Sequence, residues 1–460
     1  MGGKAQISKL RNHAVKNLGP KGEPALSASR KLEDKPWAGA REDAAAVAQA
    51  LAAAPAGRLP QVVRALRNRN FRLFWSGNFL SNIGTWMQNV AQGWLVLLLT
   101  ANSAFWLGVV GFAGSIPFLL FTLFGGVIAD RVNKRQMLLA TQSAMMTLAF
   151  LLAGLAYWKV ITVWEVALIA FLNGTAMAMN APCYQALVPQ LVERQDLTNA
   201  IALNSAQFNM SRFLGPTLGG YAMAVLGVAG NFFLNGVSFL AVLAALLRLH
   251  YPAEAQQRHP SLLSSLGAGL GYLRAHREMY VLAWMVALFS LLAMPFITFI
   301  PYFARSQLHT GAAGLGWLLA GSGSAGVLGA VVVAAGYTVR HRGRIIPATG
   351  LTLFVSMIVF AYSRSFALSE CMACVEGFCG MLMLSSVNVV MQQRSSNQMR
   401  GRVMSIYSTC FLGLPPLGSL LAGGLARHFP IAHVLAVMSG LATLAFLGFF
   451  TFSRELRELD

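Results

Sequence analysis

Long apolar segments recur along almost the whole chain, and they constrain its fold more than any other feature. A helix of about 20 apolar residues crosses the ~30 Å hydrocarbon core of a bilayer and satisfies its own backbone hydrogen bonds there. Twelve segments of this kind follow residue 70. We therefore predict an all-α membrane protein with twelve transmembrane helices in two six-helix bundles. The predicted spans are residues 71–99, 104–129, 136–158, 162–182, 199–225, 229–249, 279–304, 311–338, 345–363, 367–391, 402–426 and 430–452.

The composition agrees with this class of protein. Only 11% of the 460 residues are charged and 56% are hydrophobic, with a mean hydropathy of +0.57. Soluble domains carry about 25% charged residues. The deficit excludes an ordinary soluble domain.

The net charge of +19 is distributed as in a membrane protein, which argues against a nucleic acid partner. Of the 35 Lys and Arg residues, 14 precede residue 73 and 16 lie in other segments predicted to be cytoplasmic. Cytoplasmic loops of membrane proteins carry such an excess of basic residues. We therefore expect both termini to be cytoplasmic. The basic residues left in predicted outer loops are Lys159, Arg305, Arg364 and Arg427.

Polar stretches divide the chain into five predicted parts. The first stretch has few large apolar residues and cannot bury a core, so we expect it to be disordered. The parts are a disordered cytoplasmic tail at 1–58, an N-terminal six-helix bundle at 59–249, a cytoplasmic linker with an amphipathic helix at 250–278, a C-terminal six-helix bundle at 279–453 and a cytoplasmic C-terminal tail at 454–460.

The two predicted bundles repeat several features in the same order, which indicates an internal duplication. In such a pseudo-symmetric protein, the binding site lies near the membrane midplane between the halves. The matching residues are Pro216 and Gly219 with Pro415 and Gly418, the loop residues Gly126, Arg131 and Lys134 with Gly336, His341 and Arg344, and, more weakly, Asn173 in FLNG with Glu376 in CVEG.

The charged loop GVIADRVNKR lies between the second and third predicted spans. Gly126 permits close helix packing, Asp130 can accept hydrogen bonds from a helix N-terminus, and the basic residues place the loop in the cytoplasm. The loop resembles the signature of the major facilitator superfamily, G-x-x-x-D-R-x-G-[RK]-[RK]. Asn133 stands in place of a glycine. Asparagine tolerates a left-handed turn best among the non-glycine residues, so the departure is mild. The resemblance implies a conformational latch made of Gly126, Asp130, Arg131, Lys134 and Arg135.

The resemblance covers about residues 62–452. The segments 78–100, 186–220 and 399–424 are similar to bacterial enterobactin exporters and macrolide efflux proteins. It implies a monomeric transporter in a bacterial inner membrane that exports a small organic compound (siderophore, drug or metabolite) by proton antiport with alternating access. Two alternatives stay open: an importer of a small metabolite, and a membrane sensor or interaction protein that transports nothing.

Two charged residues, Arg212 and Glu376, lie deep inside predicted spans and away from their ends, where a charge is costly and is a functional candidate by default. Arg212 lies near the middle of the fifth span and can attract an anionic substrate, pair with a carboxylate, or hold helices together. Glu376 lies in the tenth span and is the best candidate for a protonatable coupling site. Its alternative is a permanently neutral acid in a polar contact. Asn173, at the matching position of the first half, is a further candidate.

The first span is rich in amides. Asn82 and Asn89 are seven residues apart and share one helix face, while Gln88 lies on another face with Ser81. We expect one face to line the cavity, although single polar residues there could equally hold helices together. Thr85 stands where many relatives carry an acid, which weakens a proton-carrying role for this span.

The segment GPTLGG in the fifth span resembles an antiporter motif that is associated with export, with Ser211 in place of its first glycine. A proline removes a backbone hydrogen bond and small residues permit close packing, so a packing seam without directional meaning is the alternative. The motif residues are Gly215, Pro216, Gly219 and Gly220.

We predict no enzyme activity, cofactor or metal site. GSGSAG at 321–326 matches a dinucleotide-binding fingerprint, but no strand precedes it, so we expect helix packing by small residues. Cys371 and Cys374 form a CxxC pair without a second pair, and the histidines form no metal-ligand spacing.

Overall fold

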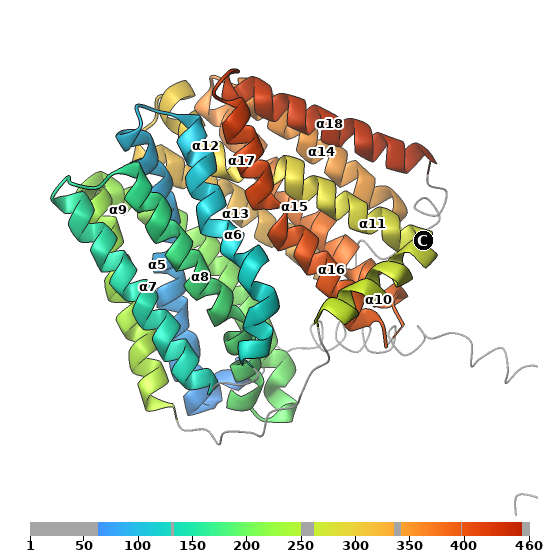
Figure 1. Ribbon diagram of the computed structural model, residues 1–460, viewed down its shortest axis with the longest axis horizontal. Helices are drawn as coiled ribbons and strands as arrows, with labels where there is room; N and C mark the ends of the chain where they lie inside the picture. Colours follow the sequence, from blue (N-terminus) through green and yellow to red (C-terminus); the bar gives the residue numbers. More distant parts are fainter. Residues whose placement is uncertain (1–62, 130–132, 250–261, 335–341, 397, 453–460) are drawn as a thin grey trace, which may run out of the picture. The chain divides into compact units, whose positions relative to one another are not determined.

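The computed structural model describes residues 63–129, 133–249, 262–334, 342–396 and 398–452, and every regular element in them is helical (Figure 1). The first part comprises a 3₁₀ turn η1 (Arg64–Arg67), α5 (Arg69–Leu99), α6 (Ala104–Ala129), α7 (Lys134–Tyr157), α8 (Val163–Leu187), the 3₁₀ turns η2 (Val188–Leu191) and η3 (Arg194–Asp196), and α9 (Leu197–Arg248). The second part comprises α10 (Leu262–Ala275), α11 (Arg277–Leu288), the π-turn η4 (Phe289–Ala293), α12 (Phe296–Tyr302), the π-turn η5 (Phe303–Gln307), α13 (Ala312–Ala334), α14 (Arg342–Tyr362), α15 (Phe366–Arg394), α16 (Arg400–Gly413), α17 (Pro415–Leu425) and α18 (Ile431–Phe452).

Ten helical segments among the described residues are long and apolar enough to cross a membrane. One of them, Arg194–Arg248, contains Gly227 with φ 70° and ψ −179°, so it consists of two helices that meet at this residue. The 31-residue α5 is not among the ten, and it carries the amides noted above. The all-α membrane fold is confirmed, whereas the number of twelve spans stays a prediction.

Two predicted spans are less regular than expected. The seventh, predicted as one helix over 279–304, is interrupted by η4 and η5, with Pro295 between η4 and α12. The eleventh, predicted over 402–426, is divided into α16 and α17 at Pro415. A proline has no backbone N–H and clashes with the preceding helical turn, which accounts for the division of the eleventh span.

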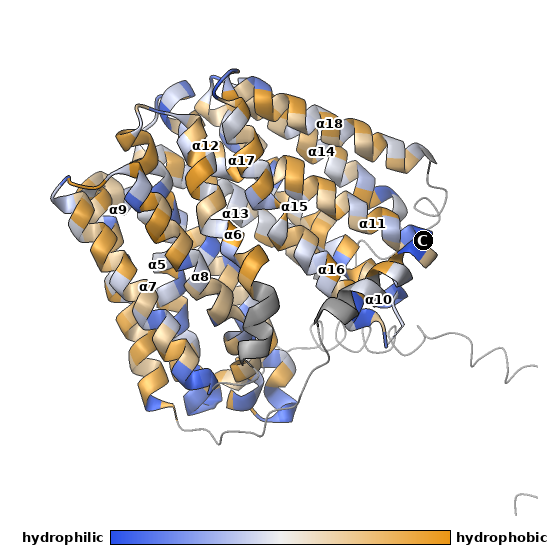
Figure 2. Cartoon of the chain, viewed as in Figure 1, coloured by the Kyte–Doolittle hydropathy of each residue, from blue (hydrophilic) through white to orange (hydrophobic). Residues whose placement is uncertain are grey.

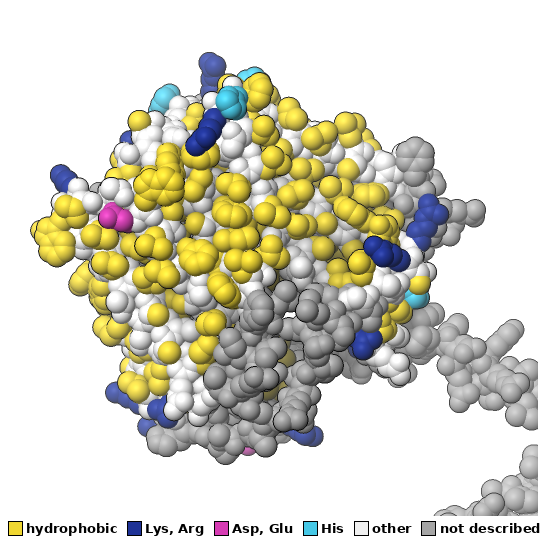
Figure 3. Space-filling model, in the orientation of Figure 1, with side chains coloured by type: hydrophobic (Ala, Val, Ile, Leu, Met, Phe, Trp, Pro, Cys, Tyr) yellow, Lys and Arg dark blue, Asp and Glu magenta, His cyan; other side chains and the backbone are white. Residues whose placement is uncertain are grey.

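Polarity varies along the helices as a bilayer requires. Figure 2 shows hydrophobic residues along the helices and hydrophilic residues gathered near many of their ends. Figure 3 shows the same on one face, where hydrophobic side chains cover the middle and Lys and Arg lie toward the edges. A surface of this kind is stable only where apolar lipid covers it.

The helices form two halves, α5–α9 and α11–α18. In the first half α5 packs along α9, α6 along α8, and α7 against α8 and α9. In the second half α13 and α14 pack along α15, and α14 packs along α18. The halves contact each other where α9 packs along α13 and α6 along α17 (Figure 1).

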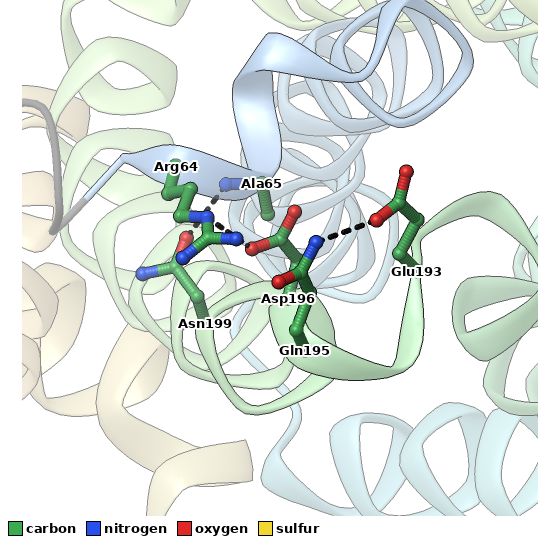
Figure 4. A network of polar contacts seen from close by, with 6 residues as sticks. All are labelled: Arg64, Ala65, Glu193, Gln195, Asp196 and Asn199. Atoms are coloured by element: carbon green, nitrogen blue, oxygen red, sulfur yellow. Dashed lines mark hydrogen bonds and ion pairs between the residues drawn. The ribbon is translucent and has the colours of Figure 1, made fainter.

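The chain enters α5 through a polar network (Figure 4). Arg64 Nε lies 2.7 Å from Asp196 Oδ1, and the backbone N–H of Ala65 donates to Asn199 Oδ1 at 2.9 Å. These contacts join η1 to the connection between α8 and α9. Asn68 is extended, with ψ 119°, and separates η1 from α5.

The backbone conformation of Asn133 differs from the left-handed turn that the family glycine would permit. It is extended, with φ −65° and ψ 114°, and not left-handed. Its Oδ1 accepts hydrogen bonds from the backbone N–H groups of Arg135 and Gln136 at 3.0 and 3.3 Å. The residue is the N-cap of α7. An N-cap satisfies backbone donors that have no partner within the helix, so its side chain and not its turn conformation explains this asparagine.

We expect Asn68→Ala to lower the free energy of unfolding by about 0.5–2 kcal/mol, because the first turn of α5 loses its capping oxygen. Asn68 Oδ1 accepts from the N–H groups of Asn70 and Phe71 at 3.0 and 3.4 Å. Thermal unfolding of the purified protein in detergent measures the change. Asn68→Ser retains a capping oxygen and should unfold close to wild type; equal destabilisation by both variants would contradict the capping role.

Candidate functional site

The predicted latch is described only in part. Asp130 and Arg131 lie outside the described residues, and Gly126 lies in the last turn of α6. Lys134 is the first residue of α7. Arg135 donates from Nε to the carbonyl oxygen of Leu246 at 2.7 Å and from Nη2 to that of Leu247 at 2.6 Å. It thus caps the C-terminal end of α9, where a cation is favoured by the helix dipole.

The GPTLGG segment is where α9 contacts two helices at once. A Cβ atom on Gly215 would meet Trp86, and one on Gly219 would lie 3.0 Å from the Cα of Met87, both on α5. A Cβ atom on Gly220 would lie 2.9 Å from the Cα of Gly316 on α13, in the other half. The glycines therefore permit close backbone approach within the first half and across the halves.

The second half repeats this arrangement. A Cβ atom on Gly418 would meet the carbonyl oxygen of Leu291, in the first predicted span of its own half. A Cβ atom on Gly423 would lie 2.9 Å from the Cα of Gly108 on α6, in the other half. Each half thus contacts the other through a pair of facing glycines, Gly220 with Gly316 and Gly423 with Gly108.

Asn173 and Glu376 occupy corresponding positions in the two halves. Asn173 precedes Gly174, whose Cβ atom would meet the carbonyl oxygen of Gly114 on α6. Glu376 precedes Gly377, whose Cβ atom would meet the carbonyl oxygen of Ser322 on α13. In both halves the glycine contacts the second predicted span. The weak sequence parallel between FLNG and CVEG therefore corresponds to the same packing in space.

Arg212 and Glu376, which the sequence offered as separate candidates, are brought together. They belong to opposite halves, Arg212 to α9 and Glu376 to α15, and both lie beside the same turn of α13, because a Cβ atom on Gly377, the residue after Glu376, would meet the carbonyl oxygen of Ser322. α13 packs against both helices, and a Cβ atom on Gly323 would lie 3.1 Å from the carbonyl oxygen of Arg212. In a regular helix the N–H of residue 216 would donate to this carbonyl oxygen, but Pro216 has no N–H. Because Gly323 has no side chain, the carbonyl oxygen can lie close to α13.

Glu376 is buried, with 6% of its surface exposed, and its Oε2 has no hydrogen-bond partner. Along its whole length, the neighbouring α13 carries no Asp, Glu, Lys, Arg or His. In α14 the basic residues Arg342 and Arg344 lie in the first turn, far from the middle of the span. A buried carboxylate oxygen without a donor is costly, so this atom requires a proton or a donor from a ligand.

Helix α5 presents two different polar faces. On one, Gln88 is buried and its Oε1 accepts from Asn235 Nδ2 at 2.7 Å, while a Cβ atom on Gly84 would meet Ser238. On the other, Asn89 is exposed and Asn82 is half-buried. This second face includes Gly93, whose Cβ atom would lie 3.0 Å from Pro301 in the other half. The spacing of 4 and 11 residues from Gly93 directs Asn89 and Asn82 toward the other half.

We expect the two faces to respond differently to substitution. Gln88→Ala leaves the buried amide of Asn235 without its partner and should lower the free energy of unfolding by about 1–3 kcal/mol. Asn89→Ala should leave unfolding unchanged and alter substrate affinity or transport rate. Thermal unfolding and transport assays on both variants test this; the reverse pattern would contradict the assignment of the faces.

Two contacts between the halves were not anticipated from the sequence. The guanidinium of Arg305 lies 5.4 Å from the ring centre of Trp94, and that of Arg427 lies 3.6 Å from the ring centre of Phe105. Each joins a predicted outer loop of the second half to the first half. Attraction between a cation and an aromatic face accounts for them. The sequence contained a signal for these contacts, because Arg305 and Arg427 are among the few basic residues in predicted outer loops.

The remaining motifs serve packing in the part of the chain that is described. Gly323 and Gly326 of GSGSAG contact the backbones of Arg212 and Gly377, as expected for a helix-packing segment. Cys371 and Cys374 form no disulfide, and the described residues contain no group of three His, Cys, Asp or Glu side chains that could hold a metal ion.

Comparisons with known proteins agree on the class. The family model described as "Transmembrane secretion effector", of the MFS group, matches residues 62–460. The chain is 23% identical to the staphyloferrin A transporter of Staphylococcus aureus (84% of this chain, 97% of the relative) and 28% identical to the multidrug efflux pump Tap of Mycolicibacterium fortuitum (81% and 92%). It is 20% identical to macrolide efflux protein A of Streptococcus pyogenes (85% and 97%).

Solved structures show the same fold. The nucleoside transporter NupG matches with a TM-score of 0.66 at 14% identity, over 84% of this chain and 99% of that one. A POT family transporter matches with a TM-score of 0.69 at 10% identity, over 85% and 97%. The relatives are transporters and pumps, not enzymes. The chain belongs to the transmembrane secretion effector family of major facilitator superfamily transporters.

Proposed function

We propose that this chain is a proton-coupled exporter of small organic compounds in a bacterial inner membrane, and that it works as a single chain with both termini cytoplasmic. The observation that carries the proposal is that Arg212 and Glu376, from opposite halves, lie beside the same turn of α13, and that the buried Oε2 of Glu376 has no hydrogen-bond partner. A protonatable group that interacts with the opposite half can link its proton to the relative movement of the halves.

The chemistry follows from the two charges. When Glu376 is ionised, it attracts Arg212. This attraction favours the arrangement in which α9 of the first half lies beside α13 and α15 of the second half. When Glu376 takes up a proton, the attraction is lost and Arg212 remains as an unpaired cation. The relative stability of the two arrangements then depends on the proton, which is the requirement for coupling.

The relatives support export as the direction. Two of them are named as efflux proteins and one as a staphyloferrin A transporter, and the matches extend over most of each chain. We propose alternating access as the mechanism, with Asp130 and Arg131 as part of the latch. We also retain the predicted domain boundaries, with 1–58 as a tail, 59–249 and 279–453 as bundles, 250–278 as the linker and 454–460 as the second tail.

The test is accumulation of a panel of siderophores and fluorescent dyes in inside-out membrane vesicles with an acidic lumen. The proposal expects accumulation that collapses when the proton gradient is dissipated by an uncoupler. Vesicles without the protein supply the control. Accumulation that persists without a gradient would contradict proton coupling, and uptake into right-side-out vesicles would favour the importer.

A further inference from the structure

The space around Arg212 presents two chemical groups to a ligand. Arg212 is half-buried, and its backbone lies beside Gly323 of α13, next to the turn of α13 that Glu376 of the other half also approaches. Glu376 Oε2 is buried and accepts no hydrogen bond. The carboxylate therefore lacks a donor, and the guanidinium of Arg212 offers donors to an anionic group.

An aromatic pair lies one helical turn from Arg212. Phe208 precedes Arg212 by four residues on α9, so the two side chains share one side of the helix. Its ring centre lies 6.1 Å from that of Trp86 on α5, in an edge-to-face arrangement, and 52% of Phe208 is exposed. Trp86 also lies on the face of α5 that carries Asn82 and Asn89. The pair offers an apolar surface beside the charged groups.

Proton antiport restricts which ligand can use this site. A purely anionic ligand would bind Arg212 and compete with Glu376 for it. It would bind best when Glu376 carries a proton, so anion and proton would travel in the same direction. A purely cationic ligand would bind Glu376 but would be repelled by Arg212. Only a ligand with both groups satisfies the guanidinium and also excludes the proton from Glu376.

We propose that the substrate is a zwitterion whose anionic group binds Arg212, whose protonated amine binds Glu376, and whose apolar body lies against Trp86 and Phe208. This inference rests on the proposed proton antiport and names its substrate class. The amine and the proton compete for one carboxylate, so the two cannot be bound at the same time. The other charged groups that face this region are few: α13 offers none, and α15 contributes Glu370 near its predicted outer end.

The experiment measures binding of matched ligand triplets to the purified protein. Each triplet shares an aromatic body: a zwitterion with a carboxylate and a secondary amine, such as a piperazinyl fluoroquinolone, its methyl ester as the cation, and its N-acetyl derivative as the anion. Three different aromatic bodies are used. We expect the zwitterions to bind at least about tenfold more tightly than either single-charge form.

Substitutions assign each preference to one residue. Glu376→Gln should abolish the preference for the zwitterion over the anion, and Arg212→Gln should abolish its preference over the ester. Glu370→Gln tests the other carboxyl group of α15, whose Oε2 also has no hydrogen-bond partner. It should bind as wild type; loss of the preference in this variant and not in Glu376→Gln would assign the amine to Glu370 and overturn the inference. Thermal unfolding excludes variants that fail to fold, and Arg212→Lys provides a charge-retaining substitute.

The outcomes separate this inference from the proposed function. Equal binding of the three forms, or no zwitterion among the ligands that bind, overturns the inference even if gradient-driven export of other compounds is observed. A zwitterion preference that both substitutions leave intact overturns it as well. A zwitterion preference that is lost on substitution of Arg212 and Glu376 supports the inference. If gradient-driven export is then absent, that result counts against proton coupling alone.

Discussion

Glu376→Gln is expected to abolish accumulation of substrate against its gradient while transport down the gradient continues. The amide has nearly the same shape as the acid, so α15 should keep its packing against Ser322 of α13. It cannot exchange a proton, so the variant behaves as if Glu376 were always protonated. Arg212 then has no charged partner in either arrangement of the halves.

The size of the effect follows from the gradient itself. A difference of one pH unit supplies ~1.4 kcal/mol per proton, which supports about tenfold accumulation for one proton per substrate. Wild-type vesicles should reach this ratio and Glu376→Gln vesicles a ratio of about one. Glu370→Gln is the matched control and should accumulate substrate as wild type does. Gradient-dependent accumulation by Glu376→Gln would remove this residue from the coupling role.

Gly423→Leu is expected to prevent α6 and α17 from approaching each other and so to disfavour the arrangement seen here. Even a Cβ atom at this position would lie 2.9 Å from the Cα of Gly108, and its other neighbours are backbone atoms that cannot move aside alone. Overpacking of this kind costs about 1–3 kcal/mol. A shift of about 1–3 kcal/mol changes the ratio of two arrangements about 5–150-fold.

The next residue provides a matched control. Gly424 has nothing within 4 Å of a Cβ position, and Gly424→Leu changes the helix propensity of α17 in the same way. The measurement is labelling of a cysteine placed at Ser419, which is 3% exposed and contacts Gly108, in a background without the native cysteines. Gly423→Leu should accelerate labelling by a membrane-impermeant maleimide and slow transport, and Gly424→Leu should do neither. Equal labelling of both variants would contradict a gate at this glycine pair.

Much of the fold could be predicted because the membrane leaves few choices. Uninterrupted apolar runs require helices, so α6 and α13 begin within one residue of their predicted starts. The turn at Gly227 also lies in the predicted gap between spans, where glycine permits a positive φ. The π-turns at 289–293 and 303–307 could not be predicted, because they depend on local packing around Pro295 and Pro301 rather than on hydropathy.

The helix caps were predictable in principle but were missed. Asn68 and Asn133 each precede a helix that begins with basic residues, and asparagine is a preferred N-cap. The family signature has a glycine at the position of Asn133, which implies a role in the turn and not in the helix cap. The observed role is hydrogen bonding by its side chain.

The site was predicted as a set of separate residues and not as an arrangement. Burial of an ionisable group in an apolar segment is visible in the sequence, which is why Arg212 and Glu376 were found. Their common position beside α13 depends on the contacts of α13 with α9 and α15, and no periodicity in the sequence encodes which helix of one half meets which helix of the other. The division of α5 into the faces of Gln88 and Asn89 likewise needed the position of Asn235.

The most direct test of the central claim, that Glu376 and Arg212 couple proton movement to substrate movement, is to record the lumenal pH of inside-out vesicles when substrate is added. With an acidic lumen and a pH-sensitive dye, the account predicts that a substrate of the panel makes the lumen more alkaline in wild-type vesicles and leaves its pH unchanged in Glu376→Gln vesicles. Alkalinisation of equal size in both would contradict the account.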